Sequence, residues 1–495
     1  MARIAVIGAG MGAMAAAARL AVAGHPRNTV VVLERTDTYG GAVRRHTRDG
    51  FAFDTGPGLL HLPAVYRDLF VKTGRQQLEE RVELTRIPLT ARHVFADGTS
   101  VSLPNGSRGQ LVDALDEGLG EGAGERWAQL LTRAREAWEA TRRPLLEEPL
   151  RDEPSSRAAL ARDGAYPALR EKGLARLTRT LRAGGAPRRT LAEVAARELR
   201  DPRLAAMLES YAWAHGLDPA TTTAGAAVLP YIEDAFGTWY VGGGMRALAD
   251  AVYARCVERR VEFRFGAEVV GVREKDGRAA GLELADGTTV EADAVIAAGG
   301  PAAPGGPGAP EGSVRGSARL TVLLALRGGR PEGTPHRTVV HRAEAPGQPL
   351  TVLRPGDPAL LPEGGEGAET AVLSVPVPVG SVGGRDEGAA AERLADRLLA
   401  AAEEAGLGLS GRVLWREVRT PSDNEAETGA PGGRIPAPAL PGGAGAFLHA
   451  PNLTALPGLL LAGGWSHPGG GLPAAGMTGA MAAGLFQDAG WRGSQ

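Results

Sequence analysis

Residues 3–14 read RIAVIGAGMGAM, and this stretch decides the fold. The apolar run that ends at Ile7 predicts a buried strand beginning at Arg3, and the alanine-rich residues 14–23 predict a helix after a glycine turn. A second apolar run at residues 29–33 predicts another strand. The sequence therefore begins with a β-α-β unit.

The glycine turn between the first strand and the helix has the pattern GxGxxA. Gly8 allows the tight turn, Gly10 lets the backbone approach a pyrophosphate, and the small Ala13 lets the helix and strand pack closely. The N-terminus of the helix then faces the negative charge of the phosphates. Because the pattern follows a predicted strand and opens a predicted helix, it predicts a dinucleotide-binding site.

An acidic residue, Glu34, follows the second predicted strand and lies 21 residues after Ala13. A carboxylate at about this position accepts hydrogen bonds from an adenosine ribose. The alternative is a solvated carboxylate at the end of a strand, but the glycine turn and the acid occur together. A carboxylate also disfavours a 2′-phosphate, so we expect FAD or NAD rather than NADP.

The composition excludes several partners and sites. The 495 residues include 55 Lys and Arg and 57 Asp and Glu, so we expect no nucleic-acid partner held by long-range charge. The single cysteine, Cys256, allows no internal disulfide and no zinc site of paired thiolates, and we predict no metal site. Cys256 lies in a predicted helix, where a small buried side chain is favoured over a reactive thiol.

The N-terminal segment imitates a secretory signal, because Arg3 precedes an apolar run. The glycines of the turn and Arg19 interrupt this run, so a strand followed by a turn explains it better. No segment offers about 18 uninterrupted apolar residues for a membrane span. We expect a cytoplasmic protein, while peripheral association with a membrane and the oligomeric state stay open.

Further motifs distinguish FAD from NAD. The stretch Tyr39-Gly40-Gly41 and the FDTGP stretch at residues 53–57 have no obvious role in a simple NAD site. Arg35 belongs to the same series of motifs, as part of Leu33-Glu34-Arg35. With the glycine turn, they resemble the FAD-binding fingerprint shared by phytoene desaturases, amine oxidases and protoporphyrinogen oxidases. GTWYVGGGM at residues 237–245 and AGGWSHPGGGLP at residues 462–473 narrow the resemblance, and the second is similar to the C-terminal motif of phytoene desaturase-like proteins.

The resemblance spans the chain and implies an α/β fold, in which a Rossmann-like FAD-binding domain is interleaved with a substrate-binding domain of β-sheet plus helical insert. The residue pattern agrees, because residues 109–215 have helical spacing whereas residues 319–326, 338–342, 350–353 and 371–379 have strand character. We expect FAD-binding parts at residues 1–65, 236–300 and 441–495, a helical insert at 66–235, and the substrate-domain sheet at 301–440.

The resemblance also implies which residues bind FAD. Glu34 is expected at the ribose, Val269 on the adenine side, and Pro473 near the flavin ring. Family members often carry Arg directly after the glycine pair, whereas Ala42 and Val43 precede Arg44 here, so no phosphate contact is assigned to Arg44. The expected cofactor-binding residues are Gly8, Gly10, Gly12, Ala13, Glu34, Arg35, Gly40, Gly41, Gly56, Pro57, Val269, Gly463, Gly464, Leu472 and Pro473.

Candidates for the chemistry come from the same motifs. His467 is the leading catalytic candidate by its motif position, although a histidine in such a loop equally suits a structural bond to the backbone. Trp239, Tyr240 and Trp465 are candidates for the substrate pocket, and plain core is the alternative for these aromatic residues. His61, after the turn at residues 56–58, is a further pocket candidate.

The reaction implied by the resemblance is desaturation of an apolar molecule, either isoprenoid or carotenoid-like or a secondary metabolite. Hydride passes from a substrate C–H bond to flavin N5 and a proton leaves the neighbouring carbon, which forms the double bond. Oxygen, a quinone or another acceptor then reoxidises the flavin. One alternative is a flavin amine oxidase acting on a small amine. The other is a non-catalytic lipid-binding escort of the same fold, against which the glycine turn, Glu34 and the C-terminal motif argue.

Overall fold

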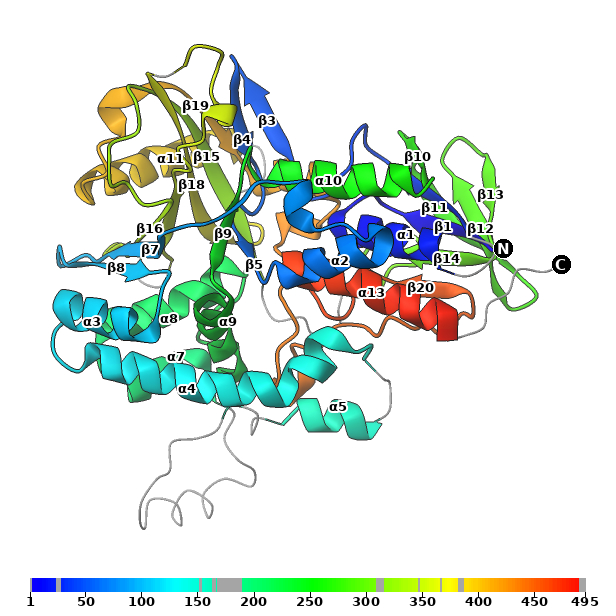
Figure 1. Ribbon diagram of the computed structural model, residues 1–495, viewed down its shortest axis with the longest axis horizontal. Coiled ribbons are helices and arrows are strands. Elements are labelled where there is room, and N and C mark those ends of the chain that lie inside the picture. The colour runs from blue at the N-terminus through cyan, green and yellow to red at the C-terminus, as the bar shows by residue number, and fades with distance from the viewer. Residues whose placement is uncertain are drawn as a thin grey trace, which may run out of the picture.

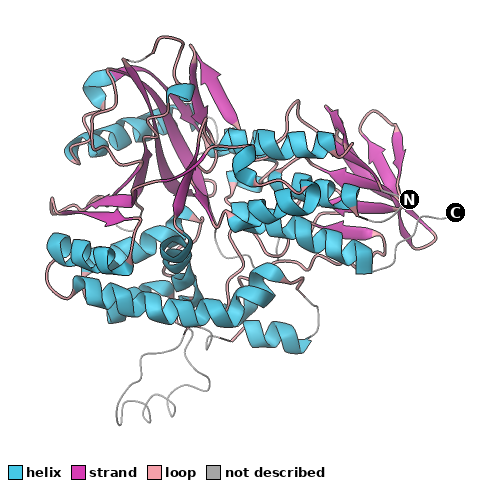
Figure 2. Cartoon of the chain, in the orientation of Figure 1, coloured by secondary structure: helices cyan, strands magenta, loops and turns pink. Residues whose placement is uncertain are grey.

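The computed structural model describes residues 2–23, 28–150, 154–162, 166, 189–308, 316–345, 348–365, 367–381 and 387–488. Figure 1 shows a sheet with flanking helices on the right, a second and larger sheet at the upper left, and a group of helices at the lower left. Figure 2 shows the same division between helices and strands. Residues 163–165 and 167–188 of the predicted insert lie outside the described residues.

Five parallel strands form the first sheet, in the order β10-β2-β1-β14-β20. The central strand β1 pairs on both sides, with Val6 opposite Val32 and Ile296. The sheet therefore combines strands that are far apart in the sequence. Their bounds are β1 (Arg3–Ile7), β2 (Thr29–Glu34), β10 (Glu262–Phe265), β14 (Ala294–Ala297) and β20 (Leu459–Leu461).

The two faces of this sheet are covered differently, because side chains alternate along a strand. Ile4 and Val6 pack among helices, whereas Ala5 and Ile7 pack against a small three-stranded sheet. Cys256 is fully buried in one of these helices, as predicted. The covering elements are α1 (Met11–Val22), α2 (Ala64–Gly74), α10 (Met245–Glu258) and α13 (Leu472–Asp488) on one face, and β11 (Val269–Lys275), β12 (Arg278–Leu284) and β13 (Thr289–Glu291) on the other.

Seven strands form the second sheet, in the order β19-β15-β18-β17-β16-β7-β8. All neighbouring strands run antiparallel except β16 and β7. One face packs against helix α11 (Glu387–Glu404) through residues such as Leu320 and Leu398. The strands are β7 (Leu89–Val94), β8 (Ser100–Pro104), β15 (Ser317–Arg327), β16 (Arg337–Val340), β17 (Leu350–Leu353), β18 (Ala368–Pro378) and β19 (Val413–Arg419).

The helical group packs around its own core, in which Trp127 and Leu130 of the longest helix of this group, α4, are buried. Ser107 and Gln110 form a capping box at the start of α3, which explains why that helix begins there. None of the described helices combines the length and the apolar character needed to cross a membrane. The group contains α3 (Arg108–Leu119), α4 (Ala123–Arg142), η2 (Arg143–Glu147), α5 (Pro154–Leu160), α7 (Leu191–Val194), η4 (Ala195–Leu199), α8 (Pro202–Ala214), η5 (Ala224–Ala227) and α9 (Val228–Phe236).

Short elements connect these parts. Strand β9 pairs with both β5 and β6, and β3 pairs with β4 in a separate hairpin. Helix α12 follows the edge strand β19 directly and begins at a capping box of Thr420 and Asp423. Their bounds are β3 (Arg45–Arg48), β4 (Phe51–Asp54), β5 (Leu60–His61), η1 (Leu78–Glu80), β6 (Leu84–Arg86), β9 (Thr238–Val241), η6 (Pro358–Leu360), η7 (Ser410–Arg412), α12 (Pro421–Thr428), η8 (Pro431–Gly433) and η9 (Gly443–Gly445).

The structure departs from the expected segments in two places. The boundary expected at residue 65 falls inside α2, whose Tyr66 and Leu69 belong to the core beside the parallel sheet. The predicted helical insert also supplies β7 and β8 to the seven-stranded sheet. Local composition cannot predict that α2 packs beside the parallel sheet or that β7 and β8 join the seven-stranded sheet, because both depend on contacts with distant segments of the chain.

Asp54 of the FDTGP stretch contacts the start of helix α10, which follows the glycines at residues 242–244. Its carboxylate accepts hydrogen bonds from the backbone N–H groups of Met245 (2.6 Å) and Arg246 (3.2 Å), the first residues of α10. The N-cap residue, Gly244, supplies no side-chain bond of its own. Burial raises the pKa of Asp54 to about 6, although these bonds to the charged form oppose the shift. Asp54 thus caps α10 from another part of the chain.

Replacing Asp54 with Ala should lower the free energy of unfolding by about 1–2 kcal/mol, because the first amides of α10 lose their acceptor. Urea unfolding of the purified protein measures the change. The matched control is Asp113→Ala, which removes an exposed carboxylate from α3 and should change stability by less than about 0.5 kcal/mol. Equal stability of the Asp54 variant and the wild type would contradict the capping role.

Candidate functional site

One cavity of about 830 Å³ extends between the parallel sheet, the seven-stranded sheet and the helical group. This volume lies in the upper part of the range of about 300–1,000 Å³ that small-molecule and cofactor sites occupy. All the residues predicted to bind FAD line it, from Gly8 at the glycine turn to Pro473 in the last helix. The structure therefore brings together motifs from both ends and the middle of the chain.

The glycine turn forms one wall of the cavity. Gly8 has a φ of +88°, which a residue with a side chain adopts only with strain. A Cβ atom at Gly10 would meet only the Cα of Gly41, at 3.8 Å, so the turn leaves open space in front of its backbone. Helix α1 begins here with no side-chain cap and no acidic residue in its first turn. Its first amide groups are therefore available to an anion.

Glu34 lies at the end of β2, lines the same cavity and is 8% exposed. Its Oε2 accepts the backbone N–H of Ala9 at 2.8 Å, while its Oε1 accepts the N–H and the hydroxyl of Thr36, each at 2.9 Å. These bonds fix the carboxylate beside the glycine turn. An ionised carboxylate has about four acceptor positions, so Oε2 keeps capacity for one more donor.

The loop after Glu34 lies against the FDTGP stretch. Gly40 and Gly41 both have positive φ values, +107° and +62°. A Cβ atom at Gly56 would lie 2.0 Å from the carbonyl oxygen of Ala42, so only glycine permits this approach. The close contact shapes one part of the cavity wall and places Gly56 and Pro57 in it.

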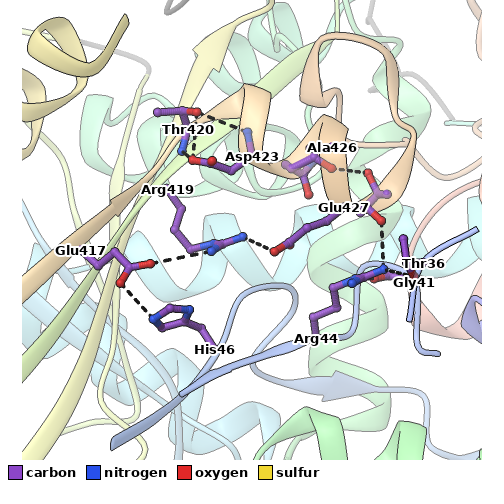
Figure 3. Close-up of polar contacts among 12 residues, drawn as sticks. Thr36, Gly41, Arg44, His46, Glu417, Arg419, Thr420, Asp423, Ala426 and Glu427 are labelled. Carbon is purple, nitrogen blue, oxygen red and sulfur yellow. Dashed lines mark hydrogen bonds and ion pairs between the residues drawn. The ribbon is translucent and has the colours of Figure 1, made fainter. Parts of the chain in front are cut away.

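Arg44 and residues of α12 line another part of the cavity, and Figure 3 shows the polar contacts around them. The guanidinium of Arg44 donates to the carbonyl oxygen of Gly41, to the hydroxyl of Thr36 and to the carbonyl oxygen of Glu427, each at 3.0 Å. The Glu427 carboxylate pairs in turn with Arg419. Arg35 donates to the carbonyl oxygen of Ala426 at 2.6 Å. This network joins the parallel-sheet part to the edge of the seven-stranded sheet.

The C-terminal motif forms the wall of the cavity next to the glycine turn. Gly463 has a φ of +86° and lies against the glycine turn, where a Cβ atom at Gly12 would meet the Cα of Gly463 at 3.0 Å. Helix α13 begins at Leu472, so Pro473 is its second residue rather than its first. Proline is accepted there because the first amides of a helix have no partner within it. The first turn of α13 contains no acidic residue.

His467 does not lie at the cavity, which corrects its predicted catalytic role. The side chain is fully buried, and its Nε2 lies 3.0 Å from the carbonyl oxygen of Glu148. Burial lowers the pKa of His467 to about 4, so the ring is neutral at physiological pH. Its neighbours Trp465 and Pro468 line the cavity, but His467 does not. His467 thus makes a structural contact with the backbone, which was the alternative to a catalytic role.

Two of the predicted pocket aromatics also face elsewhere. The indole N–H of Trp239 donates to the carbonyl oxygen of Phe236 at 2.9 Å, and the hydroxyl of Tyr240 donates to Asp357 at 2.8 Å. Neither residue lines the cavity, because their side chains make these other contacts. Trp465 and His61 do line it, as predicted.

The half of the cavity beyond the C-terminal motif contains a charged cluster that motif reasoning missed. Glu233 of α9 pairs with Arg337 of β16, and its other carboxylate oxygen lies 3.6 Å from Nε2 of His61. Tyr211 approaches the same carboxylate with its hydroxyl at 3.4 Å. Two adjacent acids, Glu233 and Asp234, in the otherwise largely apolar helix VLPYIEDAF are the sequence signal for this cluster.

The charges of this cluster follow from burial and pairing. Burial lowers the pKa of His61 to about 4, although Glu233 favours its protonated form. Burial by itself would raise the pKa of Glu233, but the Arg337 guanidinium and the hydrogen bonds to the carboxylate outweigh it and hold the pKa below its usual value. Glu233 and Arg337 therefore form an ion pair beside a neutral imidazole.

Comparison with known proteins identifies the family. Residues 14–304 match the family model of flavin containing amine oxidoreductases, and the chain belongs to this family. The fold class and the resemblance expected from the sequence are confirmed. The protein is an FAD-dependent oxidoreductase, and FAD is its cofactor. The alternative function of a non-catalytic lipid-binding escort is therefore set aside.

Relatives with assigned activities include carotenoid enzymes. Hydroxyneurosporene desaturase of Cereibacter sphaeroides is 30% identical over 511 residues, covering 97% of this chain and 96% of that protein. The zeta-carotene-forming phytoene desaturase of Myxococcus xanthus is 30% identical over 59% of this chain and 52% of its own length. The 4,4'-diapolycopene oxygenase of Methylomonas sp. is 31% identical, and the alignment spans 55% of that protein.

Solved structures share the fold at low identity. An oxidoreductase from Methanosarcina mazei aligns with a TM-score of 0.64 and 17% identity, over 98% of this chain and 100% of that chain. Putrescine oxidase bound to putrescine aligns with a TM-score of 0.65 and 14% identity, over 98% of this chain and 99% of that chain. At such identities the agreement concerns the architecture.

The burial of His467 predicts a stability that falls as the pH falls. Its folded pKa of about 4 is below the unfolded value of about 6.5, so the unfolded chain binds the proton first and stability is lost between these pH values. Urea unfolding measured from about pH 7 to pH 5 should therefore show a weaker pH dependence for His467→Gln than for the wild type. Identical slopes for the two proteins would show that the histidine titrates normally in the folded state.

Proposed function

We propose that the protein is a desaturase or dehydrogenase that removes hydride from a largely apolar substrate, isoprenoid, carotenoid-like or another secondary metabolite. The observation that carries this proposal is the cavity of about 830 Å³, which runs from the glycine turn past the C-terminal motif to a half walled by helices. That half is lined by apolar side chains such as Leu145, Val228 and Ile232. Relatives named for hydroxyneurosporene and phytoene act on long polyenes or their precursors, which supports an elongated apolar substrate.

The residues of the first half fit FAD. The uncapped first turn of α1 suits the pyrophosphate, and the open space in front of Gly10 allows the phosphates to approach the backbone. The free acceptor capacity of Glu34 suits a ribose hydroxyl, with Val269 on the adenine side. Gly463, Gly464, Leu472 and Pro473 are proposed to lie near the ring, where amides of α13 stabilise negative charge.

FAD, when bound, would supply the hydride acceptor and the route by which the electrons reach oxygen or a quinone. The chain itself would orient the two reactants, because three parts of the fold line the cavity. We assign His467 no direct role, and its burial and its contact with the carbonyl oxygen of Glu148 support this. His61 is the neutral histidine that lines the cavity, and its Nε2 faces Glu233.

We propose that one set of the interleaved segments binds the cofactor and that the other set forms the substrate-binding part. Residues 1–65, 236–300 and 441–495 would hold the cofactor, together with α2, which packs beside the parallel sheet. Residues 66–235 and 301–440 would form the substrate part, with β7 and β8 joined to its sheet. Residues of both sets of segments line the same cavity, which supports this division.

Replacing Glu34 with Ala should weaken FAD binding about tenfold or more, because a hydrogen bond to a charged acceptor contributes about 1.5–3 kcal/mol. Flavin absorbance relative to protein absorbance, measured after dialysis, reports the loss. Glu332→Ala, which removes an exposed carboxylate outside the cavity, serves as the control and should retain FAD. Full cofactor content in the Glu34 variant would remove the ribose assignment.

Anaerobic mixing of the FAD-loaded protein with polyenes, saturated isoprenoids and cyclic amines tests the reaction. We expect the flavin band to bleach with an isoprenoid or polyene and the recovered product to contain one more double bond. His467→Ala should keep the wild-type reduction rate, since the histidine does not reach the cavity. Bleaching with amines alone, with hydrogen peroxide formed in air, would instead establish the amine oxidase alternative.

A further inference from the structure

Three hydroxyl groups form a row across the cavity-facing side of the seven-stranded sheet. Thr321 of β15 lies opposite Ser374 of β18, and Ser374 lies opposite Thr351 of β17. Side chains of directly opposed residues stand on the same face, about 5 Å apart at Cβ. All three residues line the cavity. Among the described residues, none of these hydroxyl groups has a hydrogen-bond partner.

A guanidinium lies at one end of this row. Arg319 precedes Thr321 by two residues on β15, so its side chain stands on the same face, and it lines the cavity. It donates one hydrogen bond, to the carbonyl oxygen of Ala214 at 2.9 Å, and no carboxylate of the described residues lies within salt-bridge distance. Burial lowers the pKa of this guanidinium, which shows the cost of holding its charge there.

Arg337, the guanidinium of the charged cluster in this half of the cavity, already has its counter-charge. Arg337 is paired with Glu233 and also donates to the carbonyl oxygen of Thr90 at 2.9 Å. His215, near Arg319, is neutral because burial lowers its pKa, and its Nδ1 lies 2.8 Å from the carbonyl oxygen of Tyr211. Unlike Arg337, Arg319 has no carboxylate within salt-bridge distance among the described residues. Arg35 and Arg44 also lack one, but they lie in the cofactor half, where they donate to carbonyl and hydroxyl oxygens.

The opposite wall has a different chemistry. Leu145, Leu146, Leu229 and Ile232 of the helical group present an apolar surface to the same space. A pure hydrocarbon would match this wall, but against the sheet it would cover hydroxyl groups and a guanidinium and leave them without acceptors. A ligand that satisfies both walls carries an apolar body and an acceptor group.

We propose that the substrate carries an anionic oxygen group, such as a carboxylate, which Arg319 and the hydroxyl row of Thr321, Ser374 and Thr351 bind while its apolar body lies along the helical wall. This inference rests on the proposed function and narrows its substrate class. The guanidinium supplies the charge-assisted hydrogen bonds and the hydroxyl groups donate to the remaining acceptor positions. A site built in this way disfavours an analogue that lacks the group, because the polar residues are then left unpaired.

Parinaric acid, a fluorescent polyene carboxylate, and its methyl ester form a matched pair of probes for the FAD-loaded protein. At about pH 8 the acid is ionised, and we expect it to bind at least about tenfold more tightly than the ester. Arg319→Gln should remove this preference by weakening the acid alone. Arg327→Gln, on the same strand but exposed and outside the cavity, should leave both affinities unchanged.

A second variant tests the hydroxyl row. Thr321→Val preserves the shape of the side chain and removes one donor, so acid binding should weaken by about threefold to tenfold while ester binding stays constant. The proposal is overturned if the wild type binds acid and ester equally or binds neither. It is also overturned if Arg319→Gln weakens both probes alike, which indicates a structural role, or loses FAD, which assigns the guanidinium to the cofactor.

These results are independent of the reaction itself. The acid-to-ester ratio is a binding measurement and does not require reduction of the flavin. A clear preference for the acid without bleaching by any polyene would leave the anion site in place and contradict the proposed desaturation. Bleaching by a hydrocarbon polyene without any acid preference would support the reaction and remove the anion site.

Discussion

The close packing of the glycine turn against the C-terminal motif is the contact on which the rest of the structure depends. Gly12 lies so near Gly463 that a Cβ atom would come within 3.0 Å of its Cα, and Gly479 of α13 fits directly against the backbone of Ala15 and Ala16 in α1. Any larger side chain at these positions would separate the two helices. The contact joins the beginning and the end of the chain into one layer beside the parallel sheet, and the intervening segments must be arranged around it.

That arrangement creates the cavity. The cofactor half is built from main-chain groups and small residues, because the backbone itself must approach a large polyanionic ligand. The other half lies between the helical group and the seven-stranded sheet. Its helical wall is largely apolar apart from residues such as Glu233 and Tyr211, and the facing strands carry hydroxyl groups and Arg319. The network of Arg44, Glu427 and Arg419 holds these two halves together at one edge (Figure 3).

The cofactor-binding half of the cavity could be predicted from the sequence, because phosphate binding depends on residues that are close together in the chain. A strand, a glycine turn and a helix in succession define the phosphate site, and Glu34 follows at the distance that one β-α-β unit sets. The strand at residues 350–353 was predicted with the observed bounds, since a short apolar run between turns has few alternatives. Side-chain direction was the weak point. His467, Trp239 and Tyr240 belong to the expected motifs, but their side chains contact other parts of the chain and do not line the cavity.

The sequence by itself determined the class of cofactor, the β-α-β unit that binds it, and the membership of the chain in a family of flavin oxidoreductases. Only the tertiary structure decided that Glu233 would pair with Arg337, that His467 would be buried, and that Arg319 would face the cavity. The physical reason is the range of the interactions. Turns, caps and phosphate-binding amides depend on neighbours in the sequence, whereas a charge or a hydroxyl group acquires its role from segments that meet it only after the chain has folded.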